Sequence, residues 1–115
     1  LDVLAAFPAL DAPVDAVFSA NTAHIMSWEA VQAMFAGLPA CLQPGGRLLL
    51  YGPFNREGRY TSESNAAFDA SLRREDPAMG IRDLEAVEAL AVSVGLQLRT
   101  VHGMPANNFL LDFAR

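Results

Sequence analysis

The stretch LQLRTVHGMPANNFLLDF, residues 96–113, decides the fold class of this chain. It contains two predicted strands, Leu96–Val101 and Asn108–Phe113, which are separated by a turn, His102–Asn107, that contains Pro105. Short apolar runs bounded by turn residues are typical of β-strands. Because so short a connection joins only antiparallel neighbours, the stretch predicts a hairpin at the C-terminal end of the chain.

Further back along the chain, strands and helices are predicted in alternation. The apolar runs Val14–Ala20 and Arg47–Tyr51 predict buried strands, and continuous runs of this kind are typical of strands covered on both faces. Between them, Ser27 is a candidate N-cap, and the apolar residues of Val31–Leu42 recur at helical spacing. The residues Pro44-Gly45-Gly46 are expected to end this helix.

Two more helices are predicted between the second strand and the hairpin. Thr61 or Ser62 can cap a helix that extends to the region of Arg74, and Asp83 can cap a third helix, which Gly95 ends. The order is then strand, helix, strand, helix, helix, strand, strand. Because strand–helix–strand crossovers join parallel strands, the predicted fold class is α/β, with parallel strands that end in one antiparallel hairpin.

Composition excludes several classes of function. The chain has 115 residues, of which 52% are hydrophobic and 18% charged, as expected for one globular domain. Its net charge is -5 and its basic residues do not cluster, so binding to nucleic acid or to an anionic membrane is not indicated. The single cysteine, Cys41, excludes an internal disulfide and favours a cytoplasmic protein. No cluster of residues has metal-ligand spacing, and no apolar stretch is long enough to cross a bilayer.

Uncharged polar residues collect where the predicted strands end. Asn21, Thr22 and His24 follow the first strand, Gly52–Asn55 follow the second, and Asn107–Asn108 begin the last, antiparallel strand. Open α/β sheets bind ligands beyond the carboxyl ends of their parallel strands. We therefore expect these residues to meet at one edge of the sheet and to form a site there.

Each of these residues also has a purely structural interpretation. Asn21 can satisfy backbone groups at a strand end as well as contact a ligand. His24 can be a half-exposed loop residue, or a general base, since imidazole titrates near neutrality. Gly52–Asn55 can be an ordinary turn or can face a substrate. The sequence contains no glycine-rich dinucleotide motif, no P-loop and no nucleophile elbow, so it has no phosphate-binding signature of its own.

Three stretches carry a family resemblance. ANTAH (20–24), LQPGGRLLLYGP (42–53) and VHGMPANNFLLDF (101–113) resemble the second half of a class I S-adenosylmethionine-dependent methyltransferase. The longer stretches NTAHIMSWEAV, LLLYGPFNREGRYTSESNAAFD and MPANNFLLDF resemble one group in particular, the domain-of-unknown-function family 938, also called methyltransferase-like 26. This resemblance extends over nearly the whole chain.

The resemblance implies a single, partial methyltransferase-like domain over residues 1–115, a fragment without the N-terminal glycine-rich cofactor loop. S-adenosylmethionine would bind only when the absent half is supplied. Asp2 would meet the adenine amino group, Asn21 and Thr22 would lie near the methyl end of the cofactor, and His24 would act as the base. The pocket for a small-molecule acceptor would be shaped by Tyr51, Phe54, Asn55, Asn107 and Asn108.

Two functions of different classes therefore stand at this point. The first is a methyltransferase of which this chain is the C-terminal half. The second is a non-catalytic α/β module that binds a partner or forms a homo-oligomer through an exposed sheet edge, because half a sheet leaves one strand unpaired. A nicotinamide-dependent oxidoreductase is a third possibility, and the antiparallel hairpin argues against it.

Overall fold

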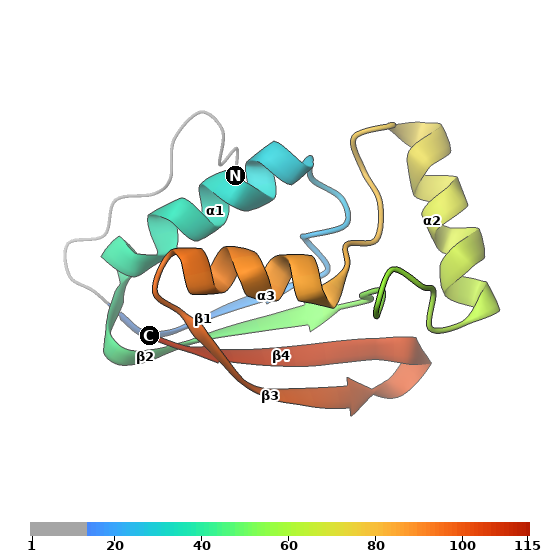
Figure 1. Ribbon diagram of the computed structural model, residues 1–115. Coiled ribbons are helices and arrows are strands. Elements are labelled where there is room, and N and C mark those ends of the chain that lie inside the picture. The colour runs from blue at the N-terminus through green and yellow to red at the C-terminus, as the bar shows by residue number, and fades with distance from the viewer. Residues whose placement is uncertain (1–13) are drawn as a thin grey trace.

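One mixed β-sheet organises residues 14–115, the part of the chain that the computed structural model describes (Figure 1). The sheet has four strands in the order β1-β2-β4-β3. Their bounds are Val14–Ala20 for β1, Leu42–Gly52 for β2, Gln97–Met104 for β3 and Asn108–Ala114 for β4.

In the described part of the chain, three helices accompany the sheet: α1 (Trp28–Cys41), α2 (Glu63–Glu75) and α3 (Leu84–Ser93). A short 3₁₀ turn, Pro105–Asn107, joins β3 to β4. Helices α1 and α3 lie side by side on one face of the sheet, whereas α2 stands beyond the arrowheads of β2 and β3 (Figure 1). The position of α2 is important for function, because it lies at the end of the sheet where the polar loops emerge.

Strand pairing confirms the predicted topology. β1 runs parallel to β2, with Phe18 paired to Leu49. β4 runs antiparallel to β2, with Leu50 paired to Leu111, and it also forms the antiparallel hairpin with β3. Because β4 lies between β2 and β3, those two strands are parallel to each other. The sheet therefore consists of parallel strands with one antiparallel strand inserted near its end.

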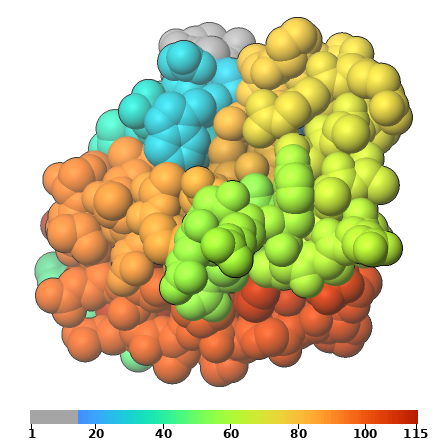
Figure 2. All heavy atoms as spheres, turned by 45° about the vertical axis from the view of Figure 1, so that its right-hand side comes forward, coloured from blue at the N-terminus to red at the C-terminus, as the bar shows by residue number. Residues whose placement is uncertain are grey.

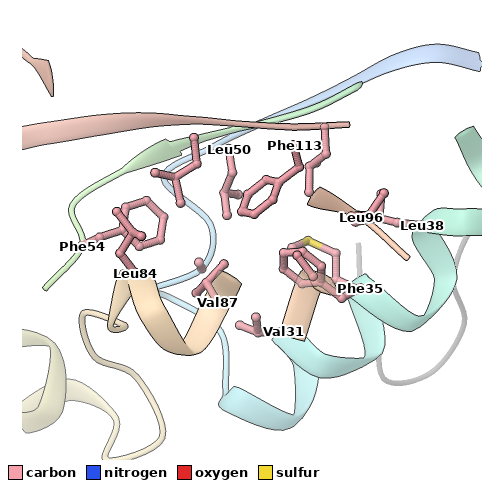
Figure 3. Packing of buried hydrophobic residues seen from close by; sticks show 14 of the residues in the cluster. Val31, Phe35, Leu38, Leu50, Phe54, Leu84, Val87, Leu96 and Phe113 are labelled. Carbon is pink, nitrogen blue, oxygen red and sulfur yellow. The ribbon is translucent and has the colours of Figure 1, made fainter. Parts of the chain in front are cut away.

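The hydrophobic core fills the space between this sheet and its two helices (Figure 3). Leu50 and Phe113 point from the sheet toward Phe35 on α1 and Val87 on α3, and all four are fully buried. Phe35 and Phe113 also meet edge to face, with ring centroids 6.0 Å apart. Full burial of each such side chain contributes about 1.5–3 kcal/mol, so this core fixes the strands whose ends carry the site.

The prediction that the strands are covered on both faces is wrong for the described residues. Helices cover a single face, and β1 lies at the edge of the sheet with the side chain of Phe18 62% exposed. An apolar run shows that a strand can be buried, but its burial depends on neighbours that the run itself does not specify. The strand exists where it was predicted, at Val14–Ala20, but its surroundings differ.

The first helix ends earlier than predicted. Its last residue is Cys41, and Leu42 already has an extended backbone, although its N–H still donates to the carbonyl of Leu38. Pro44-Gly45-Gly46 lies inside β2, where the pairing with β1 changes register. A proline disfavours helical conformation in the residue before it, which is why the helix ends ahead of this motif.

The strand registers also confirm that the predicted polar loops emerge from one edge. Ala20 at the end of β1 pairs with Tyr51, and Gly52 at the end of β2 pairs with Phe109. Met104 at the end of β3 pairs with Asn108 at the start of β4. The turns that follow β1 and β2 and the turn that precedes β4 therefore share the carboxyl edge of the sheet.

Candidate functional site

The chain leaves β1 through a tight loop that is fixed by its own backbone. Asn21 has a left-handed conformation, with φ of 55°, and its N–H donates to the carbonyl of Tyr51 at 2.8 Å. The carbonyl of Thr22 accepts from the N–H of Ile25 at 3.1 Å. The Thr22 hydroxyl oxygen, Oγ1, lies 2.5 Å from Ser19 Oγ. A left-handed residue reverses the chain locally, and asparagine adopts this conformation more readily than most residues do. The loop thereby turns His24 back against the end of β2.

His24 is buried, with 5% of its surface exposed, and it is held from two sides. Its ring meets the ring of Phe68 edge to face, with centroids 5.5 Å apart, and its carbonyl accepts from the N–H of Gly80 at 3.0 Å. A Cβ on Gly52 would lie 3.7 Å from His24 Nδ1 and 3.8 Å from Asn21 Oδ1. Glycine at this position therefore leaves room for a small group beside a ring nitrogen and an amide oxygen.

The surroundings of His24 favour its neutral form. Burial, followed by the positive charge of Arg82, lowers the pKa of His24 below its ordinary value of 6.5. Within residues 14–115, neither ring nitrogen takes part in a hydrogen bond with the protein. A neutral imidazole with an unengaged nitrogen can accept a proton from a neighbouring group.

Arg82 holds the loop that carries His24. Its Nε donates to the carbonyl of Ala23 at 3.3 Å, and its Nη2 donates to the carbonyls of Met26 and Ala78, both at 2.7 Å. The guanidinium also lies over the ring of Trp28, 5.8 Å from its centroid. One side chain thus ties the loop after β1 to the segment between α2 and α3.

Helix α2 closes the site from outside, which the sequence did not indicate. Phe68 on this helix covers His24, and Asn65 Nδ2 donates to the carbonyl of Asn107 at 3.4 Å. The helix therefore bridges the loop after β1 and the turn before β4. Phe68 and Leu72 lie four residues apart in the sequence, a spacing that predicts one shared helix face. That spacing cannot show that Leu72 is buried whereas Phe68 remains 42% exposed against a histidine.

The other predicted pocket residues lie in different environments. Tyr51 is half-buried on the sheet face that α1 and α3 do not cover, and Phe54 is fully buried in the core beside Leu84. Asn107 is exposed, and Asn108 Nδ2 donates to the carbonyl of Pro105 at 3.2 Å. Asp2 lies outside the described residues. Of the predicted residues, the structure therefore brings Asn21, Thr22 and His24 together, and α2 links Asn107 to them.

Asn55 borders a polar cavity next to this cluster. Its backbone N–H donates to the carbonyl of Arg82 at 2.9 Å, and its carbonyl accepts from the N–H of Leu84 at 2.8 Å. The cavity measures about 320 Å³ and is also lined by Trp28, Arg73 and Asp83. Figure 2 shows this face, where the start of α1 in cyan, the segment before α3 in gold and the turn after β2 in green come together. Polar and aromatic groups of this kind are typical of sites for small molecules.

Over the described range, residues 14–115, no group of three or more His, Cys, Asp or Glu side chains is arranged to hold a metal ion. In the same part of the chain, no helix has both the length and the apolar character needed to cross a membrane.

Comparison with protein families gives a match over almost the whole chain. Residues 2–115 match the model of a family described as "Protein of unknown function (DUF938)".

Comparison with solved structures places the fold. The mitomycin 7-O-methyltransferase MmcR superposes on 99% of this chain with a TM-score of 0.82 and 16% identity. An O-methyltransferase family 2 protein from Planctomyces limnophilus, in complex with apigenin, superposes on 95% with a TM-score of 0.81 and 18% identity. CalO1, a methyltransferase in calicheamicin biosynthesis solved in its SAH-bound form, superposes on 97% with a TM-score of 0.75 and 18% identity. In each case this chain spans 32% of the longer protein. At these identities the likeness concerns the fold, which is that of a methyltransferase portion.

Proposed function

This chain belongs to the DUF938 family, and we propose that it forms the C-terminal part of an S-adenosylmethionine-dependent methyltransferase that acts on the hydroxyl group of a small molecule. The observation that carries the proposal is the sheet, in which an antiparallel strand is inserted between two parallel ones, as part of a fold that superposes on O-methyltransferases. A fold alone does not establish a reaction, so the proposal also depends on the site at the carboxyl edge of the sheet.

His24 is the proposed base. S-adenosylmethionine supplies an electrophilic methyl group, and a hydroxyl becomes a good nucleophile for it when a base takes its proton. His24 is neutral near pH 7, since its pKa is lowered, and its Nδ1 borders the space that Gly52 leaves open. Phe68 packs edge to face against the His24 ring. These features suit a residue that accepts the proton from the acceptor hydroxyl.

The residues at the end of β1 fit the methyl end of the cofactor. Asn21 presents Oδ1 beside Gly52, and no Cβ occupies the space between them. Thr22 serves the loop itself, because its hydroxyl is paired with Ser19. In this proposal a larger parent protein supplies the glycine-rich loop, and Asp2 contacts the adenine. The ribose and adenine therefore need residues beyond those described.

Calorimetric titration tests the cofactor. S-adenosylmethionine is titrated into the 115-residue chain and into the full-length gene product that contains it. We expect the full-length protein to bind and the chain alone to show no measurable heat of binding. Absence of binding by the full-length protein would remove the cofactor, and with it the proposed function.

Substitution of His24 tests the base. In the full-length enzyme, His24→Ala is expected to lower kcat by about 10²–10⁴-fold, the usual contribution of general base catalysis. His102→Ala is the matched control, because His102 is exposed on β3 and is not among the residues around His24. A His24→Ala enzyme with unchanged turnover would show that the acceptor loses its proton elsewhere.

A further inference from the structure

Asp69 on α2 is a buried carboxylate with an unusually complete set of donors. It is 2% exposed. Oδ1 accepts from the N–H of Ile81 at 2.8 Å, and both oxygens accept from Arg73 Nε, at 3.2 and 3.1 Å. Oδ2 also accepts from the hydroxyl of Tyr60. Burial alone raises the pKa of Asp69, but these donors together hold it below its ordinary value, so the group is charged.

The residues that hold His24 are chain neighbours of Asp69 and of its donor Ile81. Phe68, adjacent to Asp69, covers the His24 ring, and Gly80, adjacent to Ile81, donates to the His24 carbonyl. The packing is close: a Cβ on Gly80 would lie 3.0 Å from Asp69 Oδ1. One carboxylate therefore joins the two chain segments that contact His24 from different directions.

Within residues 14–115, helix α2 buries few apolar side chains of its own. Its buried residues are Asn65, Asp69 and Leu72, so only one large apolar side chain of this helix is fully packed. A helix of this length depends on packing for its stability, and this one packs mainly through polar groups. A buried charge is tolerated only when donors surround it, and those donors then fix its geometry.

We propose that Asp69 is a positioning residue that fixes α2 and the segment 80–82 against His24 and so sets the orientation and burial of the imidazole. The proposal rests on the proposed function only for its catalytic meaning, because the contacts themselves are independent of any reaction. The atoms nearest the space beside Gly52 belong to His24 and Asn21, so Asp69 acts through its neighbours, Phe68 and the segment 80–82.

The charges around His24 make the test decisive. Arg82 faces it from the segment before α3, and α2 carries the ion pair of Asp69 and Arg73 next to Phe68. When α2 loses its anchor, water reaches the imidazole and the pKa of His24 rises toward 6.5. An effect of charge alone has the opposite sign, since removal of a nearby negative charge lowers the pKa of a histidine.

The experiment is an NMR titration of the two histidines in the 115-residue chain. Asp69→Asn keeps an acceptor for Ile81 but places a donor at Oδ2, where Tyr60 and Arg73 donate. We expect the pKa of His24 to rise in this variant. Glu75→Gln, the same change at an exposed position of α2, is the control and should leave the pKa of His24 unchanged. An unchanged or lowered pKa of His24 in Asp69→Asn would overturn the proposal, because the imidazole would then keep its burial without this carboxylate.

A milder variant covers the case in which Asp69→Asn does not fold. Tyr60→Phe removes one donor from Asp69 at a side chain that is 47% exposed. The pKa of His24 should rise here too, and a constant value would count against the positioning role. Activity separates this inference from the proposed function. If His24→Ala leaves turnover intact while Asp69→Asn still raises the pKa of His24, then His24 is not the catalytic base, but the positioning role of Asp69 stands.

Discussion

At the scale of single residues, His24 should make the stability of the protein depend on pH. Its pKa is lowered in the folded state, first by burial and then by Arg82, whereas in the unfolded chain it returns to about 6.5. Between these two values the unfolded state binds a proton and the folded state does not. The free energy of unfolding therefore rises with pH across this window. The contribution of His24 to stability is fully present above pH 6.5 and is progressively lost as the pH falls below that value.

Urea unfolding at pH values on both sides of 6.5 measures this contribution. His24→Gln should flatten the dependence, because it removes the group whose pKa differs between the two states. Asp69 and Glu85, whose pKa values are lowered from 3.8 and 4.5, affect stability only at more acidic pH. A variant that keeps the slope of the wild-type protein near pH 6 would assign the dependence to another group.

Single residues also show how far sequence can predict a site. Asn21 and His24 were predicted because polar residues directly after a buried-type strand are unusual, and strand topology alone brings them to the sheet edge. Phe54 follows β2 in the same way, yet it turns into the core and packs beside Leu84. Position along the chain places a residue at an edge, but only packing determines where an apolar side chain points.

At the scale of elements, local signals predicted where the helices begin, but they did not predict which segments α2 contacts. Ser27 was predicted as one cap, and Thr61 or Ser62 as the other. In the structure Ser27 and Ser62 each accept from the N–H of the residue three positions later. The role of α2 was not predicted, because the contacts of its Phe68 with His24 and of its Asn65 with the Asn107 carbonyl join segments distant in the sequence. Hydrophobic spacing identifies a helix and its inner face, but it does not identify the surface on which a sparsely packed helix rests.

The two caps lead to a prediction about cooperativity. Ser62→Ala and Ser27→Ala each remove one capping hydrogen bond and should each cost about 1 kcal/mol of helix stability. Because α1 packs in the core, the loss at Ser27 should lower the free energy of global unfolding in urea. Because α2 buries little apolar surface, the loss at Ser62 should appear as about fivefold faster hydrogen exchange in α2 alone. Equal global losses in both variants would mean that α2 unfolds together with the core.

At the scale of the whole molecule, helices α1 and α3 cover one face of the described part of the sheet, and the other face is open. The open face carries Phe18, Leu49 and Tyr51 together with the ion pair of Arg47 and Asp112, whose Nη1 and Oδ2 are 2.8 Å apart. Asp112 Oδ1 is buried and has no donor among residues 14–115. Large exposed apolar groups next to an unpaired strand mark a surface that associates with another surface. In our proposal the rest of the methyltransferase domain covers it.

The 115-residue chain by itself should therefore self-associate through this face. Phe18 lies on the edge strand and is 62% exposed, so Phe18→Lys removes an apolar contact and places a charge at the interface. Sedimentation velocity over a range of concentrations should show association for the wild-type chain and a shift toward monomer for the variant. Val92→Lys is the matched control, because Val92 is 59% exposed and belongs to α3, a helix that covers the opposite face of the sheet. If both variants associate as the wild-type chain does, association uses another surface. A wild-type chain that remains monomeric at every concentration would show that the open face does not bind itself.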